Sequence, residues 1–179
     1  MATQAQRDRI AEAIEATRTH LRQARDGASI TAAADTRLIE GFQVEASIRG
    51  FRLTIDEPES LGGTDRGPNP VELVLAAFGA CQEIVYATYA RILGVPIDSV
   101  SVKVEGSLDP RGFFGVAEVP AGFSHVTYTV DIQSAAPASE VTQLIATASA
   151  HCPVFDILRQ PIPVKGTYAH NGTVVLPAS

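Results

Sequence analysis

The sequence feature that most constrains the fold is a long apolar segment that follows Asn69. Asn69 is a good helix N-cap, Pro70 suits the first helical position, and Glu72 places a negative charge where the helix dipole favours one. We therefore predict a helix from about Pro70 to Leu93. Its first three turns are apolar on nearly every face, and a helix without a solvated face has to be covered on all sides.

Covering this helix requires more surface than the short strands of one subunit offer. We therefore expect an obligate homodimer with this helix at the centre of the core. The 179 residues suit one domain with an appendage. We expect residues 1–30 to be an N-terminal helical extension and residues 31–179 to be the main domain.

Alternation of apolar and polar residues predicts strands before and after this helix. Stretches rich in glycine and proline, at residues 56–70 and 109–122, predict loops. The predicted strands are a pair between Arg37 and Asp56 that turns at Arg49 and Gly50, a pair around Val100–Val104 and Val126–Ile132, and two short ones at Ile162–Val164 and Tyr168–Leu176.

Two further helices complete the prediction. Residues from about Gln4 to Arg25 carry an apolar stripe, so we expect this helix to pack on the main body or on a partner subunit, with no chemistry of its own. A second long helical region, Pro137 to Arg159, is interrupted by Pro153, which breaks or restarts the helix. Helices and strands do not alternate regularly, so the predicted fold class is α+β.

Composition excludes several classes of function. Apolar residues make up 45% of the chain and charged residues 19%, as in a globular protein. The formal charge is −6 and no cluster of basic residues stands out, so we do not expect nucleic acid as a partner. The polar N-terminus and the lack of a long unbroken apolar run predict a cytoplasmic protein without a membrane partner.

Cys81 and Cys152 are the two cysteines, 71 residues apart, which fits neither a disulfide framework nor a short-spaced zinc pattern. We predict no metal and no other cofactor. Buried cysteines often behave as small inert hydrophobes, and spacing alone favours that interpretation. Their settings weaken that interpretation without excluding it: Gln82 and Glu83 follow Cys81, and Pro153 follows Cys152. His151 adjoins Cys152, but neighbouring helical residues point about 100° apart.

Two motifs, each centred on a cysteine, resemble those of a known family. The first is Leu61-Gly62-Gly63, then Gly67-Pro68-Asn69-Pro70-Val71-Glu72-Leu73-Val74-Leu75-Ala76-Ala77 leading to Ala80-Cys81; the second is His151-Cys152-Pro153-Val154. Together they resemble the osmotically inducible protein C and organic hydroperoxide resistance (OsmC/Ohr) family, over about Arg37 to Leu176.

The resemblance implies an α+β fold with two central helices against β-sheets and two chains intertwined in a homodimer. It also implies a thiol peroxidase in which Cys81 attacks the peroxide and Cys152 resolves the product. The chemistry fits: a thiolate becomes a sulfenic acid, a second thiol condenses with it, and an external dithiol reduces the disulfide.

That mechanism requires a cation near Cys81, because a free thiol titrates at about 8.5. In the organic hydroperoxide branch of the family, an arginine on an early strand is held by a glutamate ten residues before the cysteine. Here Val71 occupies that place, with Glu72 alongside. By position the arginine candidates are Arg37 and Arg49, with Arg52 and Arg66 behind them; each of these arginines, and Glu72 as a helix cap, also has an ordinary structural interpretation.

Two functions therefore remain open from the sequence. The first is a peroxidase that reduces organic hydroperoxides, with hydrogen peroxide as a second candidate substrate, through Cys81 and Cys152. The second is a non-enzymatic relative that binds a small apolar ligand at the dimer interface or senses oxidants with its thiol pair.

Overall fold

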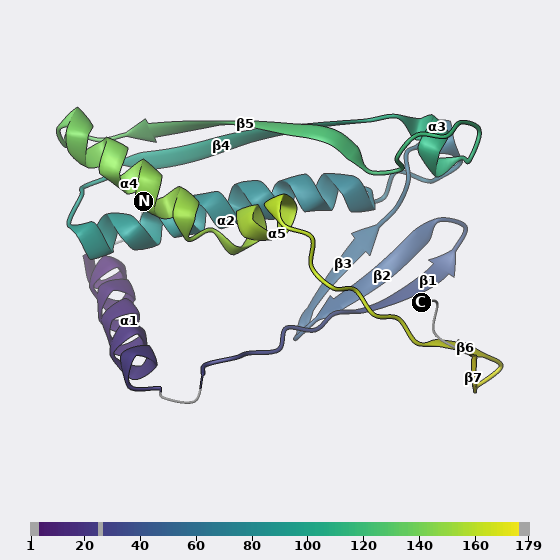
Figure 1. Cartoon of the computed structure of the whole chain (residues 1–179), viewed down its shortest axis with the longest axis horizontal. Helices are drawn as coiled ribbons and strands as arrows, with labels where there is room; N and C mark the ends of the chain where they lie inside the picture. Colours follow the sequence, from purple (N-terminus) through teal and green to yellow (C-terminus); the bar gives the residue numbers. More distant parts are fainter. Residues whose placement is uncertain (1–3, 25–26, 176–179) are drawn as a thin grey trace.

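The structure is a computed structural model that describes residues 4–24 and 27–175. Within these residues the chain folds as an α+β protein (Figure 1). The elements in chain order are α1 (Gln4–Gln23), β1 (Asp35–Glu40), β2 (Gln43–Ile48), β3 (Phe51–Ile55), a single 3-10 turn (Glu59–Leu61), α2 (Pro70–Leu93), β4 (Ser99–Leu108), α3 (Pro110–Phe113), β5 (Phe123–Gln133), α4 (Ala138–Ala150), α5 (Pro153–Arg159), β6 (Tyr168–His170) and β7 (Thr173–Val175).

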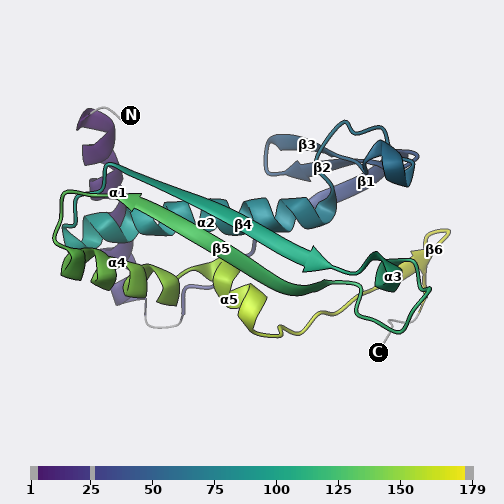
Figure 2. The same cartoon turned by 90° about the horizontal axis from the view of Figure 1, so that it is seen from above.

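The elements gather around α2. The long antiparallel β4–β5 hairpin lies along one side of this helix, and α4 and α5 run beside it (Figures 1 and 2). The antiparallel sheet β1–β2–β3 lies near the N-terminal end of α2, and α1 lies near the C-terminal end of α2. The core between α2, β4–β5 and α4 contains Phe78, Tyr86, Leu144, Ala148 and Cys152.

Helix α2 begins as the sequence predicts. The Asn69 side chain accepts a hydrogen bond from the Glu72 backbone N–H at 3.0 Å, and the Glu72 carboxylate accepts one from the Asn69 N–H at 2.8 Å. This reciprocal capping box, with Pro70 at the first helical position, fixes the start of the helix. Gly94, at φ 71°, ends it in the left-handed conformation that glycine adopts readily.

One chain covers only one side of α2. The core-facing residues include Phe78, Val85 and Tyr86, whereas Ile84, on the opposite side, is 66% exposed. The helix has the length and apolar composition of a membrane span, with 28% of its most apolar window buried. The pair α4 and α5, bent by 61° at its break, passes the same test together, and the core helices of globular proteins pass it as well.

The structure corrects the sequence prediction in three places. The first sheet has three strands and not two. The chain turns at Arg49, as predicted, and a second time at Gly41, where φ is +55°. Residues 162–164 form no strand, since Pro161 and Pro163 lack the N–H that a ladder needs. The loop over residues 109–122 contains the short helix α3. The predicted ends of the first helix, at Arg25, and of the last strand, at Leu176, lie outside the described residues.

The loop between β3 and α2 is organised around the buried carboxylate of Asp56. It accepts hydrogen bonds from the backbone N–H groups of Glu57, Thr64 and Arg66, at 2.8, 3.1 and 3.3 Å, and from the Thr64 hydroxyl at 2.5 Å. The Thr64 hydroxyl is the largest influence holding the pKa of Asp56 below its usual value, and the three N–H groups act in the same direction. Asp56 therefore fixes the path of the chain into α2.

Candidate thiol site

Helices α2 and α4–α5 bring together the two cysteines that lie 71 residues apart in sequence. The Sγ atoms of Cys81 and Cys152 are 3.4 Å apart, and both side chains are reduced. Cys81 is partly exposed, whereas Cys152 is only 2% exposed. An external reagent therefore has better access to Cys81.

Cys152 is held at the break between α4 and α5. Helix α4 ends at Ala150, and α5 begins at Pro153, which suits a first helical position because the proline lacks an N–H. Cys152 is the N-cap residue of α5 in extended conformation, with φ −86° and ψ 112°. The break turns its side chain toward α2.

Burial is the main influence on the ionisation of Cys152. It raises the pKa of this thiol, because desolvation disfavours the thiolate. The contact with Cys81 raises it further, while hydrogen bonds from the backbone N–H groups of Phe155 and Val154 act in the opposite direction. The net direction is upward, so Cys152 retains its proton more firmly than a free thiol.

Two polar side chains of α2 lie on the core-facing side of the helix: Tyr86, which the sequence analysis did not single out, and Gln82, which it named only as the residue after Cys81. Burial raises the pKa of Tyr86, and a hydrogen bond with Ser149 opposes this shift. Gln82 is fully buried, and neither its Nε2 nor its Oε1 has a hydrogen-bond partner in residues 4–24 and 27–175. The four-residue spacing of Phe78, Gln82 and Tyr86 was the available signal, since such residues share one helix face.

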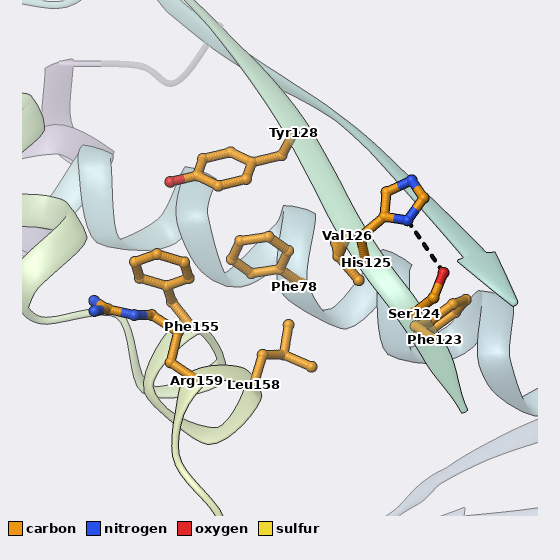
Figure 3. A pocket seen from close by; sticks show the side chains of 9 residues that line it. All are labelled: Phe78, Phe123, Ser124, His125, Val126, Tyr128, Phe155, Leu158 and Arg159. Atoms are coloured by element: carbon orange, nitrogen blue, oxygen red, sulfur yellow. Dashed lines mark hydrogen bonds between the residues drawn. The ribbon is translucent and has the colours of Figure 1, made fainter. Parts of the chain in front are cut away.

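A pocket of about 420 Å³ lies between residues of α2, β5 and α5, and neither cysteine is among the residues that line it (Figure 3). Its wall includes Phe78, which precedes Cys81 by one helical turn, and Phe155, which follows Cys152 by about one turn. Their rings stack at 5.7 Å, and the Tyr128 ring meets Phe78 edge-on at 5.0 Å. The pocket is lined by Phe78, Phe123, Ser124, His125, Val126, Tyr128, Phe155, Leu158 and Arg159.

One guanidinium lies at this pocket. Arg159 projects from α5, with its Cζ 5.1 Å from the centre of the Phe155 ring, which is a cation–π contact. The pocket thus combines aromatic walls with a positive group beside the segment that carries Cys152.

The other predicted site residues lie away from the two thiols within the chain. The Glu72 carboxylate is engaged in the capping box at the start of α2. Arg37, on β1, lies 3.9 Å from the Glu45 carboxylate, and Arg49 stacks on the Phe51 ring at the β2–β3 turn. Of the two arginines considered behind them, Arg52 pairs with Glu45 at 3.0 Å, and the Arg66 N–H binds Asp56.

His151 is exposed beside Cys152 and turns to other partners. Its Nδ1 lies 2.8 Å from the Thr147 carbonyl, and its ring is 4.9 Å from the Tyr89 ring. In the part of the chain that the structure describes, no group of three or more His, Cys, Asp or Glu side chains is placed to hold a metal ion.

Comparison with known proteins agrees with this arrangement. Residues 63–166, more than half of the chain, match the family described as OsmC-like protein. This range contains both cysteines. No curated protein sequence matches the chain significantly.

Solved structures share the fold at low sequence identity. An OsmC-like protein from Mycoplasma pneumoniae is 20% identical, with 74% of this chain and 89% of that chain covered at a TM-score of 0.64. An organic hydroperoxide resistance protein from Legionella pneumophila is 26% identical, with 74% and 92% covered at 0.56. One from Vibrio cholerae, with captopril bound in one of its active sites, is 20% identical, with 79% and 92% covered at 0.54.

Proposed function

The chain belongs to the OsmC/Ohr family, and on that basis we propose that it is a thiol-dependent peroxidase that reduces organic hydroperoxides. The observation that carries the proposal is the 3.4 Å contact between a partly exposed Cys81 and a buried Cys152. Two thiols placed in this way suit a cycle in which one is oxidised by a reagent from outside and the other closes a disulfide.

The cycle begins with the Cys81 thiolate, which attacks the outer oxygen of the hydroperoxide ROOH. The S–O bond forms as the O–O bond breaks, leaving a sulfenic acid on Cys81 and an alkoxide that takes a proton from water. Cys152 then displaces the hydroxyl group as the disulfide forms. An external dithiol restores both thiols by exchange through a mixed disulfide.

The pocket supports organic hydroperoxides over hydrogen peroxide as substrates. The rings of Phe155, about one turn after Cys152, and of Tyr128 offer accessible apolar surface in this pocket. Burying the organic part of a substrate against these rings contributes binding free energy that hydrogen peroxide cannot supply. Hydrogen peroxide is therefore a poorer substrate in this proposal.

We further propose that the protein acts as a homodimer. One side of α2 and apolar side chains of the β1–β2–β3 sheet, among them Leu38 and Phe51, are exposed in the single chain. An exposed apolar surface of this extent is typical of a subunit interface. Within the dimer, Arg37 or Arg49 of the second subunit is the proposed cation near Cys81, and Glu72 helps to orient it.

The remaining parts of the proposal concern organisation and location. Residues 1–30 form an extension on an OsmC-like domain at residues 31–179. The protein works in the cytoplasm and needs no metal or prosthetic group, and neither nucleic acid nor a membrane is its partner. The net charge of −6 supports the exclusion of nucleic acid.

The assembly is tested by sedimentation. We expect a single species of twice the 18.9 kDa chain mass at micromolar concentration, because the exposed apolar surface stabilises association. The replacement Ile84→Glu places a charge on the exposed side of α2 and should weaken the dimer. The control is Glu12→Lys on α1. Thr88→Glu would not serve as a control, because Thr88 lies one turn beyond Ile84 on the same side of α2. A folded wild-type monomer would contradict the dimer.

The peroxidase proposal is tested by stopped-flow measurement of Cys81 oxidation by an organic hydroperoxide. We expect a rate constant orders of magnitude above that of free cysteine at the same pH, because the site binds the substrate and stabilises the thiolate. A rate comparable to free cysteine would reject the enzyme. The second candidate, a non-enzymatic protein that binds a small apolar ligand or senses oxidants, would then be favoured by the same pocket and thiol pair.

A further inference from the structure

The peroxidase proposed above, on which the present inference rests, requires a group that stabilises the Cys81 thiolate. Cys81 is the twelfth residue of α2, too far from the helix N-terminus for the dipole to assist, since that effect is confined to the first turn. Among the described residues, the hydrogen bond at the Cys81 sulfur comes from another thiol rather than from a cationic side chain.

That thiol belongs to Cys152. Its Sγ lies 3.4 Å from the Cys81 Sγ, within the range of a hydrogen bond between sulfur atoms, with Cys152 as the donor. We propose that Cys152 activates Cys81 by donating its S–H hydrogen bond to the Cys81 thiolate, so that the resolving cysteine also prepares the attacking one.

Burial determines the direction of this hydrogen bond. A charge is less costly on the more solvated sulfur, and Cys81 is partly exposed while Cys152 is 2% exposed. Burial raises the pKa of Cys152, which keeps the proton on the buried sulfur despite the opposing N–H groups of Phe155 and Val154. The shared proton is therefore held by Cys152, the less exposed of the two sulfurs.

The titratable side chains around the pair do not replace this donor. Tyr86 from α2 forms its hydrogen bond with Ser149, and Tyr128 from β5 packs its ring against Phe78 and Phe155. On the α4 side, the His151 Nδ1 lies beside the Thr147 carbonyl. Within one chain, the S–H group of Cys152 is thus the donor that the fold directs at Cys81, in addition to the arginine proposed from the second subunit.

The same proton completes the resolving step. After the peroxide has converted Cys81 into a sulfenic acid, the Cys152 sulfur attacks the Cys81 sulfur. The S–S bond forms, the S–O bond breaks, and the departing hydroxyl group leaves as water with the proton that Cys152 held. The step needs no further oxidant and no separate acid.

Two replacements of Cys152 separate hydrogen bonding from packing. Cys152→Ser keeps a donor, whereas Cys152→Val approximates the volume without one, and the extended backbone at this position accepts a β-branched residue. The readout is the rate of Cys81 alkylation by iodoacetamide as a function of pH, followed by mass spectrometry of the Cys81 peptide. Alkylation reports the thiolate and does not depend on peroxide.

We expect Cys152→Val to react about tenfold more slowly than Cys152→Ser at pH 7, with the midpoint of its rate profile about one pH unit higher. The two variants should reach the same rate at high pH, where Cys81 is fully ionised in both. Cys152→Ser should stay within about threefold of the wild type at pH 7, because its hydroxyl still donates.

Superimposable profiles for the Ser and Val variants would overturn the inference. So would a loss of rate at all pH values without a shift of the midpoint, because that result indicates restricted access. If Cys152→Val does not fold, Cys152→Ala is read in the same way. If the wild type reacts slowly with hydroperoxide while the Val variant shows the predicted shift relative to the Ser variant, only the peroxidase is refuted. If the wild type reacts fast while the profiles of the two variants superimpose, only the inference is refuted.

Discussion

Cys81→Ser is expected to consume no hydroperoxide, whereas Cys152→Ser is expected to consume one equivalent and to stop at a sulfenic acid on Cys81. The partly exposed Cys81 is the sulfur that a substrate can reach, and serine cannot take over its role because a hydroxyl is a much weaker nucleophile. A reagent that traps sulfenic acids should label the Cys152→Ser variant at Cys81 and leave the Cys81→Ser variant unlabelled.

The wild type provides the reference for both variants. One equivalent of hydroperoxide should remove both free thiols of the chain by forming an intramolecular disulfide. The 3.4 Å between the two sulfurs has to shorten to about 2.05 Å, a distance that side-chain rotation can cover while α2 and α4 stay in place. We therefore expect the oxidised and reduced proteins to have the same far-UV circular dichroism spectrum.

Two results would contradict this order of reaction. If Cys81→Ser consumes hydroperoxide as fast as the wild type and Cys152→Ser consumes none, the roles of the two thiols are reversed. If neither replacement changes hydroperoxide consumption, the cysteines are inert core residues, as their sequence spacing alone favoured.

The parts of the fold that sequence reasoning predicted are those governed by local chemistry. The start of α2 followed from Asn69, Pro70 and Glu72, whose interactions span only a few residues. The break at Pro153 followed from the missing N–H of proline. Such signals depend on neighbours in the chain and therefore survive in any tertiary context.

The errors arose where alternation of apolar and polar residues concealed a turn or a proline within the same segment. Phe42 continued the alternation of the first strand, which hid the turn at Gly41. Ile162 and Val164 alternate as a strand would, but the prolines between and before them prevent pairing. Periodicity alone does not record which backbone groups can form a ladder.

The site was less accessible to prediction than the fold. Family motifs selected Cys81 and Cys152, but their 3.4 Å contact depends on how α4 packs on α2, which no short motif encodes. The pocket behind Phe78 and Phe155 depends on the same packing. Arginine candidates were chosen by strand position, and the single chain pairs Arg37 with Glu45 instead of directing it at a thiol.

The loop that leads into α2 passes close to the backbone of β3 at Gly67. Gly67→Ala is expected to lower the free energy of unfolding by about 3 kcal/mol, measured by urea denaturation, because a Cβ at this position would collide with the backbone carbonyl of Thr54. Backbone atoms cannot move aside as the end of a side chain can. Gly50→Ala is the matched control: nothing lies within 4 Å of its Cβ position, and we expect a change within about 0.5 kcal/mol.

The Gly67→Ala replacement should also affect the reaction between the two thiols, because the loop connects β3 to the capped start of α2, the helix that carries Cys81. The Asp56 N–H bonds the Pro68 carbonyl at 3.4 Å, so displacing residue 67 disturbs the same anchor that Asp56 provides. We expect Gly67→Ala to close the Cys81 to Cys152 disulfide more slowly than Gly50→Ala under the same oxidation. Equal stability of the two variants would show that the loop does not approach β3 as closely as its backbone contacts require, and equal disulfide kinetics would show that α2 is positioned by β4, β5 and α4 alone.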